Sequence, residues 1–577
     1  MEPDAHAEVP LADRVDRVGH HLGSNLVTAA ELVIEAARVH TLTGPDGSGD
    51  GSEPTHVAIA GDRILAVGDA DAVSAFVDSR TERLTFPGAT LMPGWSDGHC
   101  HPVWGLEMTA GTILLQAGDL DQAKALLRAD LPADGASGAP SGTWVLGWGL
   151  TADVFTDQSD IAGRVFDDVA AGRPLYLRFR DGHSGLANDA ALAVAGITGA
   201  EEFAGASQIV VGADGRPTGH LLEMEAMARL ESHIHRGSLS ERAGRLGRLF
   251  DSMADRGLTS LQVLDANGDP FELCTELERV GELPLTVRFS PLIQPGVTDS
   301  ELARWVRLQG TGGRRWRVEG VKLMLDGTVE GGTAWLEHPD LLGESTRPLW
   351  LPPEEYQRVV LHFARQGIPT ATHAIGDRAV EFALETLATL PEELRRSATH
   401  RIEHIETLPE ATIARMAELG VVASVQPIHA LHLHPDGRDS WSVRLGAERA
   451  ARAIPIRSLV EAGVPVVLGS DWPVADFDPF KGFAAAVARA ARTLDDGRVA
   501  VPDQSIDRWT ALRGYTSTSA IVRGDGEHTG RIEPGLSADL TLVEGDPLTM
   551  TVDELQRVTV LATWVGGRMR RVAGGGA

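Results

Sequence analysis

The chain has 577 residues, of which 43% are hydrophobic, and it carries a formal net charge of −29 at pH 7. This length and composition predict a large core divided over two or three domains. The negative charge argues against nucleic acid and anionic membranes as partners, and no apolar stretch is long enough to cross a bilayer. The two cysteines, Cys100 and Cys274, are too few for a disulfide framework, and with no apparent secretory signal they predict a cytoplasmic protein.

The two ends of the chain predict β structure. Residues 1–30 are expected to form an extension, and short strands separated by turns follow it. The expected strands are Leu32–Glu35, Ala37–Leu42, Val57–Ala60, Ala538–Val543 and Val558–Val565, with a hairpin turn at Gly61 and Asp62. Because the two ends share this pattern, residues 31–90 and 520–577 are predicted to form one small β-sandwich domain.

The middle of the chain alternates apolar runs with helical patterns. The eight runs are Leu91–Asp97, Leu258–Asp265, Leu285–Ile293, Gly320–Asp326, Pro369–Ile375, His400–Glu406, Val421–Pro427 and Pro465–Asp471. Helical patterns between them include Glu354–Gln366, Asp377–Thr389 and Pro409–Leu419. This alternation is typical of an α/β protein with a parallel (β/α)8 barrel of the TIM type, predicted over residues 91–519. The gap after the first run is too long for one crossover helix, which predicts an inserted subdomain at about residues 105–235.

Residues with metal-binding chemistry stand at the ends of several runs. The first run is followed by His99 and His101, whose side chains would share one face of a strand and could bind one cation. Catalytic groups of parallel barrels lie at the carboxyl ends of the strands, so the equivalent positions are candidates as well. They are Lys322, His373, His404 and Asp471. Cys100 would point away from the histidine face and is interpreted as a packing residue.

Each of these residues also has a purely structural interpretation. The histidines would then only close a strand, and Asp471 would cap a helix. Lys322 could be a carboxylated ligand between two metals, a direct or general-base catalyst, or an ion-pair partner of Asp326 or Glu330. Taken together, the ordered set favours a metal site.

The pattern resembles the amidohydrolase superfamily of metal-dependent hydrolases. Within it, the chain is most similar to the YtcJ-like branch (amidohydrolase family 3), which includes N-substituted formamide deformylases. The resemblance covers about residues 30–570 and is carried by Leu91–His101, Val321–Gly327, Thr372–Arg378, Arg401–His404, Ser424–Pro427, Gly469–Val474 and Gly530–Leu540. Two segments depart from the family pattern. They are Gly327–Thr333, in a loop expected to face the pocket, and Thr516–Ala520, where the family usually has an Asn-Pro-Ala-like end.

The resemblance implies a (β/α)8 barrel, a β-sandwich and one or two divalent metal ions, most commonly zinc. It implies that His99, His101 and Asp471 bind the more buried ion. It also implies that His373 and His404 bind the second ion. Lys322 falls at the position of the bridging lysine of the superfamily.

Such a site predicts metal-assisted hydrolysis. A divalent cation lowers the pKa of bound water from 15.7 to roughly 7, and the resulting hydroxide attacks a carbonyl or imine-like carbon. Asp471 would accept the water proton and pass it to the leaving nitrogen. Glu403 and Asp377 are candidates for orienting the histidines, with a surface ion pair as the alternative for each.

Substrate-binding residues are predicted around the same rim: Trp104, His183, Glu223, Asp326, Trp335, Gln426, His429 and Trp472. His183 belongs to the inserted region, where contact with substrate and hydrogen bonding within its own loop are equally open. The tryptophans favour an apolar or aromatic substrate part only weakly, because Trp is also ordinary core material.

The predicted function is hydrolysis of a C–N bond other than a peptide bond, in an N-substituted formamide, a linear amide or a cyclic amide. The partner is then a small-molecule substrate, and a homodimer is the candidate assembly. A lactonase, esterase or decarboxylase would use the same site and is the alternative. A non-catalytic binding protein on a retired barrel is least favoured, because all the expected ligands are present.

Overall fold

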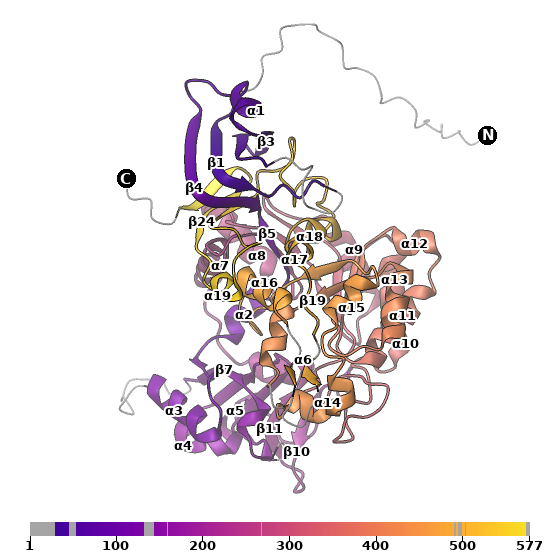
Figure 1. The fold of residues 1–577 in the computed structure, drawn as a ribbon. Helices are drawn as coiled ribbons and strands as arrows, with labels where there is room; N and C mark the ends of the chain where they lie inside the picture. Colours follow the sequence, from indigo (N-terminus) through magenta and orange to yellow (C-terminus); the bar gives the residue numbers. More distant parts are fainter. Residues whose placement is uncertain are drawn as a thin grey trace, which may run out of the picture.

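The computed structural model describes residues 29–44, 53–131, 143–157, 160–266, 268–434, 437–489, 492–493, 499–501 and 503–572. Almost all of the expected extension, residues 1–30, lies outside this part of the chain. Three regions of secondary structure follow one another from top to bottom in Figure 1. They are a sheet that joins both ends of the chain, a central part with parallel sheets, and a lower part formed by the segment after the first histidines.

The upper sheet has seven strands in the order β25-β24-β23-β4-β1-β2-β3. Its strands are β1 (Leu32–Val39), β2 (His56–Ala60), β3 (Arg63–Gly68), β4 (Glu82–Pro93), β23 (Leu540–Glu544), β24 (Val560–Val565) and β25 (Arg568–Val572). The predicted turn joins β2 to β3, where Ala60 pairs with Arg63 and Gly61 has a φ of +57°.

These seven strands form one sheet among the described residues, whereas the sequence predicted a sandwich of two packed sheets. The reason is the length of β4. Its twelve residues pair in parallel with β1 and, further along, antiparallel with β23, so strands from the two ends of the chain enter the same ladder.

The central part holds two sheets in which every neighbouring pair is parallel. Their orders are β15-β13-β12-β5 and β14-β16-β17-β18-β19-β20. The strands are β5 (Trp95–Cys100), β12 (Leu258–Val263), β13 (Thr286–Phe289), β14 (Leu292–Ile293), β15 (Trp316–Val318), β16 (Val321–Met324), β17 (Thr370–Ala374), β18 (His400–His404), β19 (Val422–Val425) and β20 (Val466–Leu468). Each of the eight predicted apolar runs overlaps at least one of these central strands, and the first run also overlaps β4.

These ladders do not close into one barrel among the described residues, so the fold that the structure establishes is mixed α/β with parallel sheets. The third predicted run is divided between β13 and β14, with Pro291, which has no N–H, at the break. The fourth contains β16, and the short strand β15 precedes it, separated from β16 by Glu319 and by Gly320 with a φ of +74°. The outer strands β5 and β20 are connected by an isolated bridge between Cys100 and Trp472.

Helices lie between the parallel strands, and most of them, though not α12, α14 or α18, contribute buried apolar residues to a common core. They are α2 (Pro102–Met108), α7 (Leu239–Ala254), α8 (Pro270–Val280), α9 (Asp299–Leu308), α10 (Pro353–Ala364), α11 (Asp377–Ala388), α12 (Glu392–Arg396), α13 (Glu410–Leu419), α14 (Ser440–Ala450), α15 (Ile456–Glu461), α16 (Pro479–Val487), α17 (Arg508–Tyr515) and α18 (Ser517–Val522). The patterns predicted around α10, α11 and α13 agree with their bounds to within two residues. The longest, α7, begins at a capping box between Ser238 and Glu241.

The lower part contains a six-stranded sheet in the order β10-β11-β9-β8-β7-β6. Its strands are β6 (Thr112–Ile113), β7 (Val145–Leu150), β8 (Leu175–Phe179), β9 (Ser184–Ala187), β10 (Gln208–Val211) and β11 (Pro217–Leu222), and its helices are α3 (Leu120–Asp130), α4 (Asp167–Ala170), α5 (Asp189–Ala195) and α6 (Glu223–Glu231). Two hydrophobic clusters of its own fill this part. The short helices α1 (Ala70–Ser74) and α19 (Val552–Leu555) belong to the chain ends.

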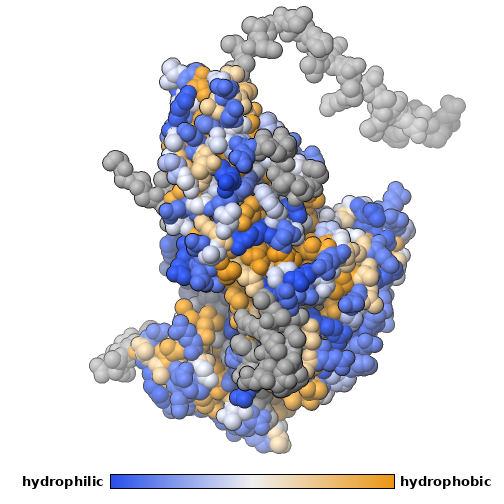
Figure 2. All heavy atoms as spheres, in the orientation of Figure 1, coloured by the Kyte–Doolittle hydropathy of each residue, from blue (hydrophilic) through white to orange (hydrophobic). Residues whose placement is uncertain are grey.

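The surface seen in Figure 2 mixes hydrophilic and hydrophobic side chains, with the hydrophobic ones gathered near the middle of the face. Within the described ranges, none of the helices has the length and apolar character needed to span a membrane.

Candidate active site

The end of β5 and the segment after β20 lie side by side and bring together three predicted ligands. The backbone N–H of Asp471 donates to the carbonyl of His99 (2.7 Å), and the N–H of His101 donates to the carbonyl of Trp472 (2.8 Å). These two hydrogen bonds fix the Asp471 carboxylate beside both imidazoles. Its Oδ1 lies 3.0 Å from His101 Nε2 and 3.3 Å from His99 Nε2.

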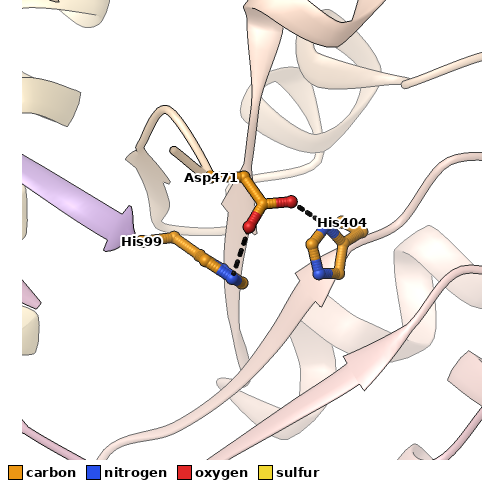
Figure 3. Close-up of side chains that lie close together, drawn as sticks. All are labelled: His99, His404 and Asp471. Atoms are coloured by element: carbon orange, nitrogen blue, oxygen red, sulfur yellow. Dashed lines mark ion pairs between the residues drawn. The ribbon is translucent and has the colours of Figure 1, made fainter. Parts of the chain in front are cut away.

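His404, at the end of β18, approaches the other oxygen of the same carboxylate. Asp471 Oδ2 is 3.8 Å from His404 Nδ1, and Figure 3 shows His99 and His404 on the two sides of Asp471. One ligand atom from each of these three buried residues lies within 4.8 Å of the other two. His404 (φ +75°) and Asp471 (φ +58°) both adopt left-handed backbone conformations, which are uncommon outside glycine and cluster at functional sites.

The charge on Asp471 is stabilised by its neighbours. Burial alone would raise the pKa of this carboxyl, but the charge of His99 and the hydrogen bond with His101 outweigh it and hold the pKa well below its ordinary value. Burial likewise lowers the pKa of His101, yet Asp265 and Asp471 more than compensate and raise it to about 9. For His404, burial is dominant and lowers the pKa well below its ordinary value.

Lys322 and His373 complete the predicted set. Lys322, on β16, is 1% exposed, and its Nζ has no hydrogen-bond partner among the described residues. Burial lowers the pKa of this amine to about 8, against the attraction of Glu403 and Asp471. His373, at the end of β17, has its ring 4.4 Å from that of His404, measured between centroids. Burial lowers its pKa well below the ordinary value, and its Nε2 lies 3.2 Å from the carbonyl of Gly327.

Glu403 orients His99, as one of the two sequence interpretations predicted. Its Oε2 lies 2.7 Å from His99 Nδ1, and Arg401 binds the same carboxylate. Asp377 has a different position. Its carboxylate accepts hydrogen bonds from the backbone N–H groups of Glu337 and Arg378, and among the described residues no hydrogen bond or ion pair joins it to the candidate histidine ligands. Cys100 Sγ lies 3.6 Å from the carbonyl of Gln262, away from the ligands.

A cavity of about 1260 Å³ opens onto this cluster and extends to the lower part of the molecule. Of the predicted substrate-binding residues, Trp104, His183 and His429 line it. The cavity wall does not include Glu223, Asp326, Trp335, Gln426 or Trp472.

Local contacts explain why these five residues stand back from the cavity. Glu223 binds His183 Nδ1 (2.8 Å). The carboxylate of Asp326 accepts backbone hydrogen bonds from Trp335, Ile375 and Gly376, and so joins two loops.

The other three pack behind the wall. The ring of Trp335 faces the guanidinium of Arg378, and that of Trp472 lies 6.3 Å from the ring of Phe477. Gln426 is 1% exposed, and both polar atoms of its side chain lack a partner among the described residues.

Several acidic residues that the sequence analysis did not select for the site lie on the cavity wall, among them Asp265, Glu330 and Glu406. Asp265 accepts a hydrogen bond from the N–H of Trp104 (3.0 Å) and lies 3.7 Å from His101 Nδ1. Asp265 and Glu406 are the last residues of two predicted apolar runs, so the rule that selected Asp471 would also have found them. Glu330 lies in an irregular loop after β16, and nothing in the pattern of the runs marks it.

Comparison with known proteins shows which family the sequence matches. The model of the Amidohydrolase family matches residues 87–570. Protein LONG AFTER FAR-RED 3 of Arabidopsis thaliana is 29% identical over 89% of this chain and 87% of its own. The putative amidohydrolase YtcJ of Bacillus subtilis is 26% identical over 85% of this chain and 90% of its own. The N-substituted formamide deformylase of Arthrobacter pascens is also 26% identical, over 89% and 94%.

Solved structures share the fold. An uncharacterized metal-dependent hydrolase from Pyrococcus horikoshii matches with a TM-score of 0.66 at 21% identity, covering 90% of this chain and 99% of its own. An adenosine deaminase from Xanthomonas campestris, with bound Zn, matches with a TM-score of 0.51 at 17% identity, covering 94% of both chains. Fold and site together define a protein of the amidohydrolase class. The match over most of the sequence shows that the chain belongs to the amidohydrolase family, as predicted.

Proposed function

We propose that the chain is a metal-dependent hydrolase of C–N bonds other than peptide bonds, acting on an N-substituted formamide, a linear amide or a cyclic amide. The observation that carries this proposal is the convergence of His99, His101 and His404 on the carboxylate of Asp471, which lines a large cavity. The amidohydrolase name of the family and the deformylase activity named for the relative from Arthrobacter pascens support the same bond type.

The donor set fits a divalent transition-metal ion. The Nε2 atoms of His99 and His101 face each other at 3.1 Å, and both lie within 3.3 Å of Asp471 Oδ1, as expected of atoms that share a cation. We assign these three residues to one ion and His373 and His404 to a second. Zinc is the proposed metal, because imidazole and carboxylate suit it. When bound, the ion would act as a Lewis acid toward a carbonyl oxygen and lower the pKa of water.

Lys322 is proposed to be a carboxylated ligand. Its buried amine has no hydrogen-bond partner among the described residues, and burial lowers its pKa, which favours the neutral form that reacts with CO2. The nitrogen forms a bond to the carbon of CO2 and loses a proton, giving an anionic carbamate. That anion would supply the negative charge that two adjacent cations require.

The two carboxylate oxygens of Asp471 are proposed to have different roles, one in metal binding and one in proton transfer. Oδ1 faces the imidazoles of His99 and His101, which places it on the ligand side. Oδ2 lies 3.8 Å from both His404 Nδ1 and His429 Nε2, on the wall of the cavity. We assign to Oδ2 the proton that is taken from water and returned to the leaving nitrogen. Glu403 holds the ring of His99 in place for this chemistry.

A further part of the proposal concerns the domain architecture of the chain. We propose that the two parallel sheets are the halves of a (β/α)8 barrel, with a β domain from residues 31–90 and 520–577 and a subdomain inserted at about 105–235. The bridge between Cys100 and Trp472 supports closure of the barrel, because it joins the end of β5 in the parallel sense to the segment that follows β20.

A substrate panel tests the function. Metal-loaded full-length protein is assayed with N-substituted formamides, linear amides, cyclic amides and lactones, and product release is followed by chromatography. Turnover of at least one C–N substrate, lost in Asp471→Asn, is the expected result. Turnover of lactones alone would favour the lactonase or esterase alternative, and activity on C–N substrates that survives in the Asn variant would refute the proposed site.

Carboxylation is tested separately. Native mass spectrometry of the protein in bicarbonate buffer is expected to show the mass of one added CO2, and Lys322→Ala is expected to lose it. The variant should also lose metal and regain part of its activity with short carboxylic acids. Full metal content and a normal rate in Lys322→Ala would show that this lysine is not a ligand.

A further inference from the structure

A buried histidine–carboxylate pair connects the lower part of the molecule to the cavity. His183, just before β9, lines the cavity, and its side chain is 7% exposed. Glu223, the first residue of α6, stands behind the cavity wall with a side chain that is 1% exposed. Nδ1 of His183 lies 2.8 Å from Oε2 of Glu223. Because a carboxylate only accepts hydrogen bonds, Nδ1 is the donor, and Nε2 is the nitrogen left for a molecule in the cavity.

The environment of Glu223 shows that its carboxylate serves this histidine. His183 is the only hydrogen-bond partner of the Glu223 side chain among the described residues, and the second oxygen, Oε1, is buried without one. The backbone of Glu223 has a φ of +69°, a left-handed conformation that costs free energy outside glycine. A buried carboxylate with one partner on a strained backbone destabilises the fold, which points to a role other than stability.

The pair is packed against the loop that departs from the family pattern. A Cβ on Gly327 would collide with Oε1 of Glu223, so glycine is required at this close approach. Asp181 accepts hydrogen bonds from the backbone N–H of His183 (3.0 Å) and from the hydroxyl of Thr328 (3.2 Å). The lower part and this loop therefore hold the ring of His183 in one position.

That position is at the candidate reaction centre. The centroid of the His183 ring lies 4.9 Å from that of His373, and the His373 ring lies 4.4 Å from that of His404. His404 in turn approaches Asp471, with 3.8 Å between Nδ1 and Oδ2. No hydrogen bond or ion pair involves Nε2 of His183 among the described residues. This nitrogen is therefore available to the part of the substrate that reacts.

We propose that His183 contacts the scissile amide group of the substrate through Nε2, and that Glu223 is the positioning residue that fixes its ring. The lower part of the molecule thereby adds to the reaction centre a group that the parallel strands do not supply. This inference rests on the proposed function for the bond that is cleaved, but not for the position of His183.

The first test compares His183→Ala with the wild type, as metal-loaded full-length protein, on two formamides that carry a small and a large N-substituent. We expect kcat/KM to fall roughly 10- to 100-fold, as for the loss of a strong hydrogen bond. The factor should be the same for both substrates, and the metal content should not change. If the alanine variant does not fold, His183→Phe keeps a ring without nitrogen atoms.

Two outcomes of this comparison would overturn the inference. A loss seen only with the large substituent would place His183 at the distant part of the substrate. A loss of metal from the variant would make His183 a metal ligand.

The second test addresses Glu223. If Glu223 acts through His183, the double variant His183→Ala, Glu223→Ala should be no slower than His183→Ala alone, because residues that act as one unit are not additive. Glu223→Gln should lose less activity than Glu223→Ala, because the amide oxygen still accepts from Nδ1. Additive losses in the double variant would show that Glu223 acts separately and would overturn its positioning role.

His40→Ala is the matched control. His40 forms a similar pair with Asp546, with 2.9 Å between Nε2 and Oδ1 and side chains 9% and 10% exposed, but it does not line the cavity. This variant should keep the wild-type kcat/KM even if its melting temperature falls. Equal losses of kcat/KM in the His40 and His183 variants would overturn the inference and leave the proposed hydrolase intact.

The proposed function fails separately, if the wild type hydrolyses no C–N substrate. Calorimetry with an N-substituted hydroxamic acid then decides the inference, because this probe keeps the amide-like group and binds metal without turnover. Its Kd is expected to rise roughly 10-fold or more in His183→Ala. An unchanged Kd would overturn the contact.

Discussion

At the amino ends of β5 and β12, the guanidinium of Arg523 is enclosed by groups that satisfy it. It donates to the hydroxyl groups of Ser96 (2.7 Å) and Ser260 (2.8 Å), and its Nε lies 2.8 Å from Asp525. Asp525 also accepts from Arg288 (2.9 Å). Among the described residues, the first residues of β5 and β18, Trp95 and His400, also have a buried polar atom without a partner, but at the carboxyl ends of the parallel strands such atoms gather on the wall of the cavity. Buried polar atoms of Lys322, His101 and His429 have no hydrogen-bond partner in the described part of the chain.

This difference between the Arg523 network and the candidate site suggests which parts of the strands serve stability and which serve function. A buried charge that is fully paired costs several kcal/mol to disrupt, because its partner is then left uncompensated. A buried polar group without a partner costs free energy in the folded protein and is retained where a ligand completes it. The amino ends are therefore expected to hold the fold together, and the carboxyl ends to carry the chemistry. The predictions below test this division.

The largest expected effect is that of Asp471→Asn. The amide keeps the shape and one acceptor oxygen but cannot take a proton, and general acid–base help is typically worth about 10²–10⁴-fold. We expect kcat to fall at least about 100-fold, with the fold retained. Steady-state kinetics and thermal melting of the same preparation check this. If Asp471 only caps the following segment, the variant will show near-normal turnover and a lowered melting point.

The second effect is on stability. Asp525→Asn leaves Arg523 and Arg288 without their shared anion, and breaking a buried ion pair typically costs about 3–5 kcal/mol. Denaturant unfolding should show a loss of this size, with kcat per folded molecule unchanged. The control is Asp299→Asn, which removes a 93% exposed carboxylate from an ion pair with Arg358 and should change little. A large loss of kcat in the Asp525 variant would contradict the division between the two ends.

Glu403→Gln is expected to have an intermediate effect on the metal. Replacing a group that orients a ligand typically reduces metal affinity or activity by about 10–100-fold. Metal titration against a competing chelator should show a loss in this range. Asp377→Asn is the comparison, because the Asp377 carboxylate accepts from the backbone N–H groups of Glu337 and Arg378, and neither a hydrogen bond nor an ion pair joins it to the candidate histidine ligands among the described residues. Equal effects of the two variants on metal affinity would show that the hydrogen bond to His99 has no special role.

The smallest effect concerns pH. Burial raises the pKa of Asp525, but Arg523 and Arg288 outweigh it and hold the pKa below its ordinary value. A carboxyl with a depressed pKa stabilises the folded state above its unfolded pKa, near 3.9, and that contribution is lost as pH falls through the folded pKa. The difference in unfolding free energy between wild type and Asp525→Asn should be constant near neutral pH and shrink below about pH 4. If this difference in unfolding free energy grew on acidification, it could not come from the ionised carboxylate of Asp525.

The sequence could predict the strands and ligands that depend on local pattern. Strand–helix alternation marked the eight runs, because buried parallel strands are continuously apolar. His99, His101, His404 and Asp471 were selected because they close such runs. The structure brings Asp471 close to both His99 and His404, and their role as ligands stays a prediction.

What depends on tertiary contacts could not be predicted. The division of the third run at Pro291, the additional strand β15, and the continuous seven-stranded sheet follow from pairing between distant strands. Asp326 was expected on the pocket wall, but its carboxylate is used to fix two loops. Glu330 was considered only as an ion-pair partner of Lys322, because a residue in an irregular loop has no periodicity that shows which way it faces.

Metal content measured together with activity tests the central claim most directly. Purified full-length protein is analysed by inductively coupled plasma mass spectrometry, stripped with chelator, and reloaded with Zn²⁺ while turnover of the best C–N substrate is followed. We predict one or two transition-metal ions per chain, loss of activity on stripping and recovery on reloading. The double variant His99→Ala, His101→Ala should neither hold the ion nor recover. Full activity of the stripped protein, with no metal detected, would contradict the account.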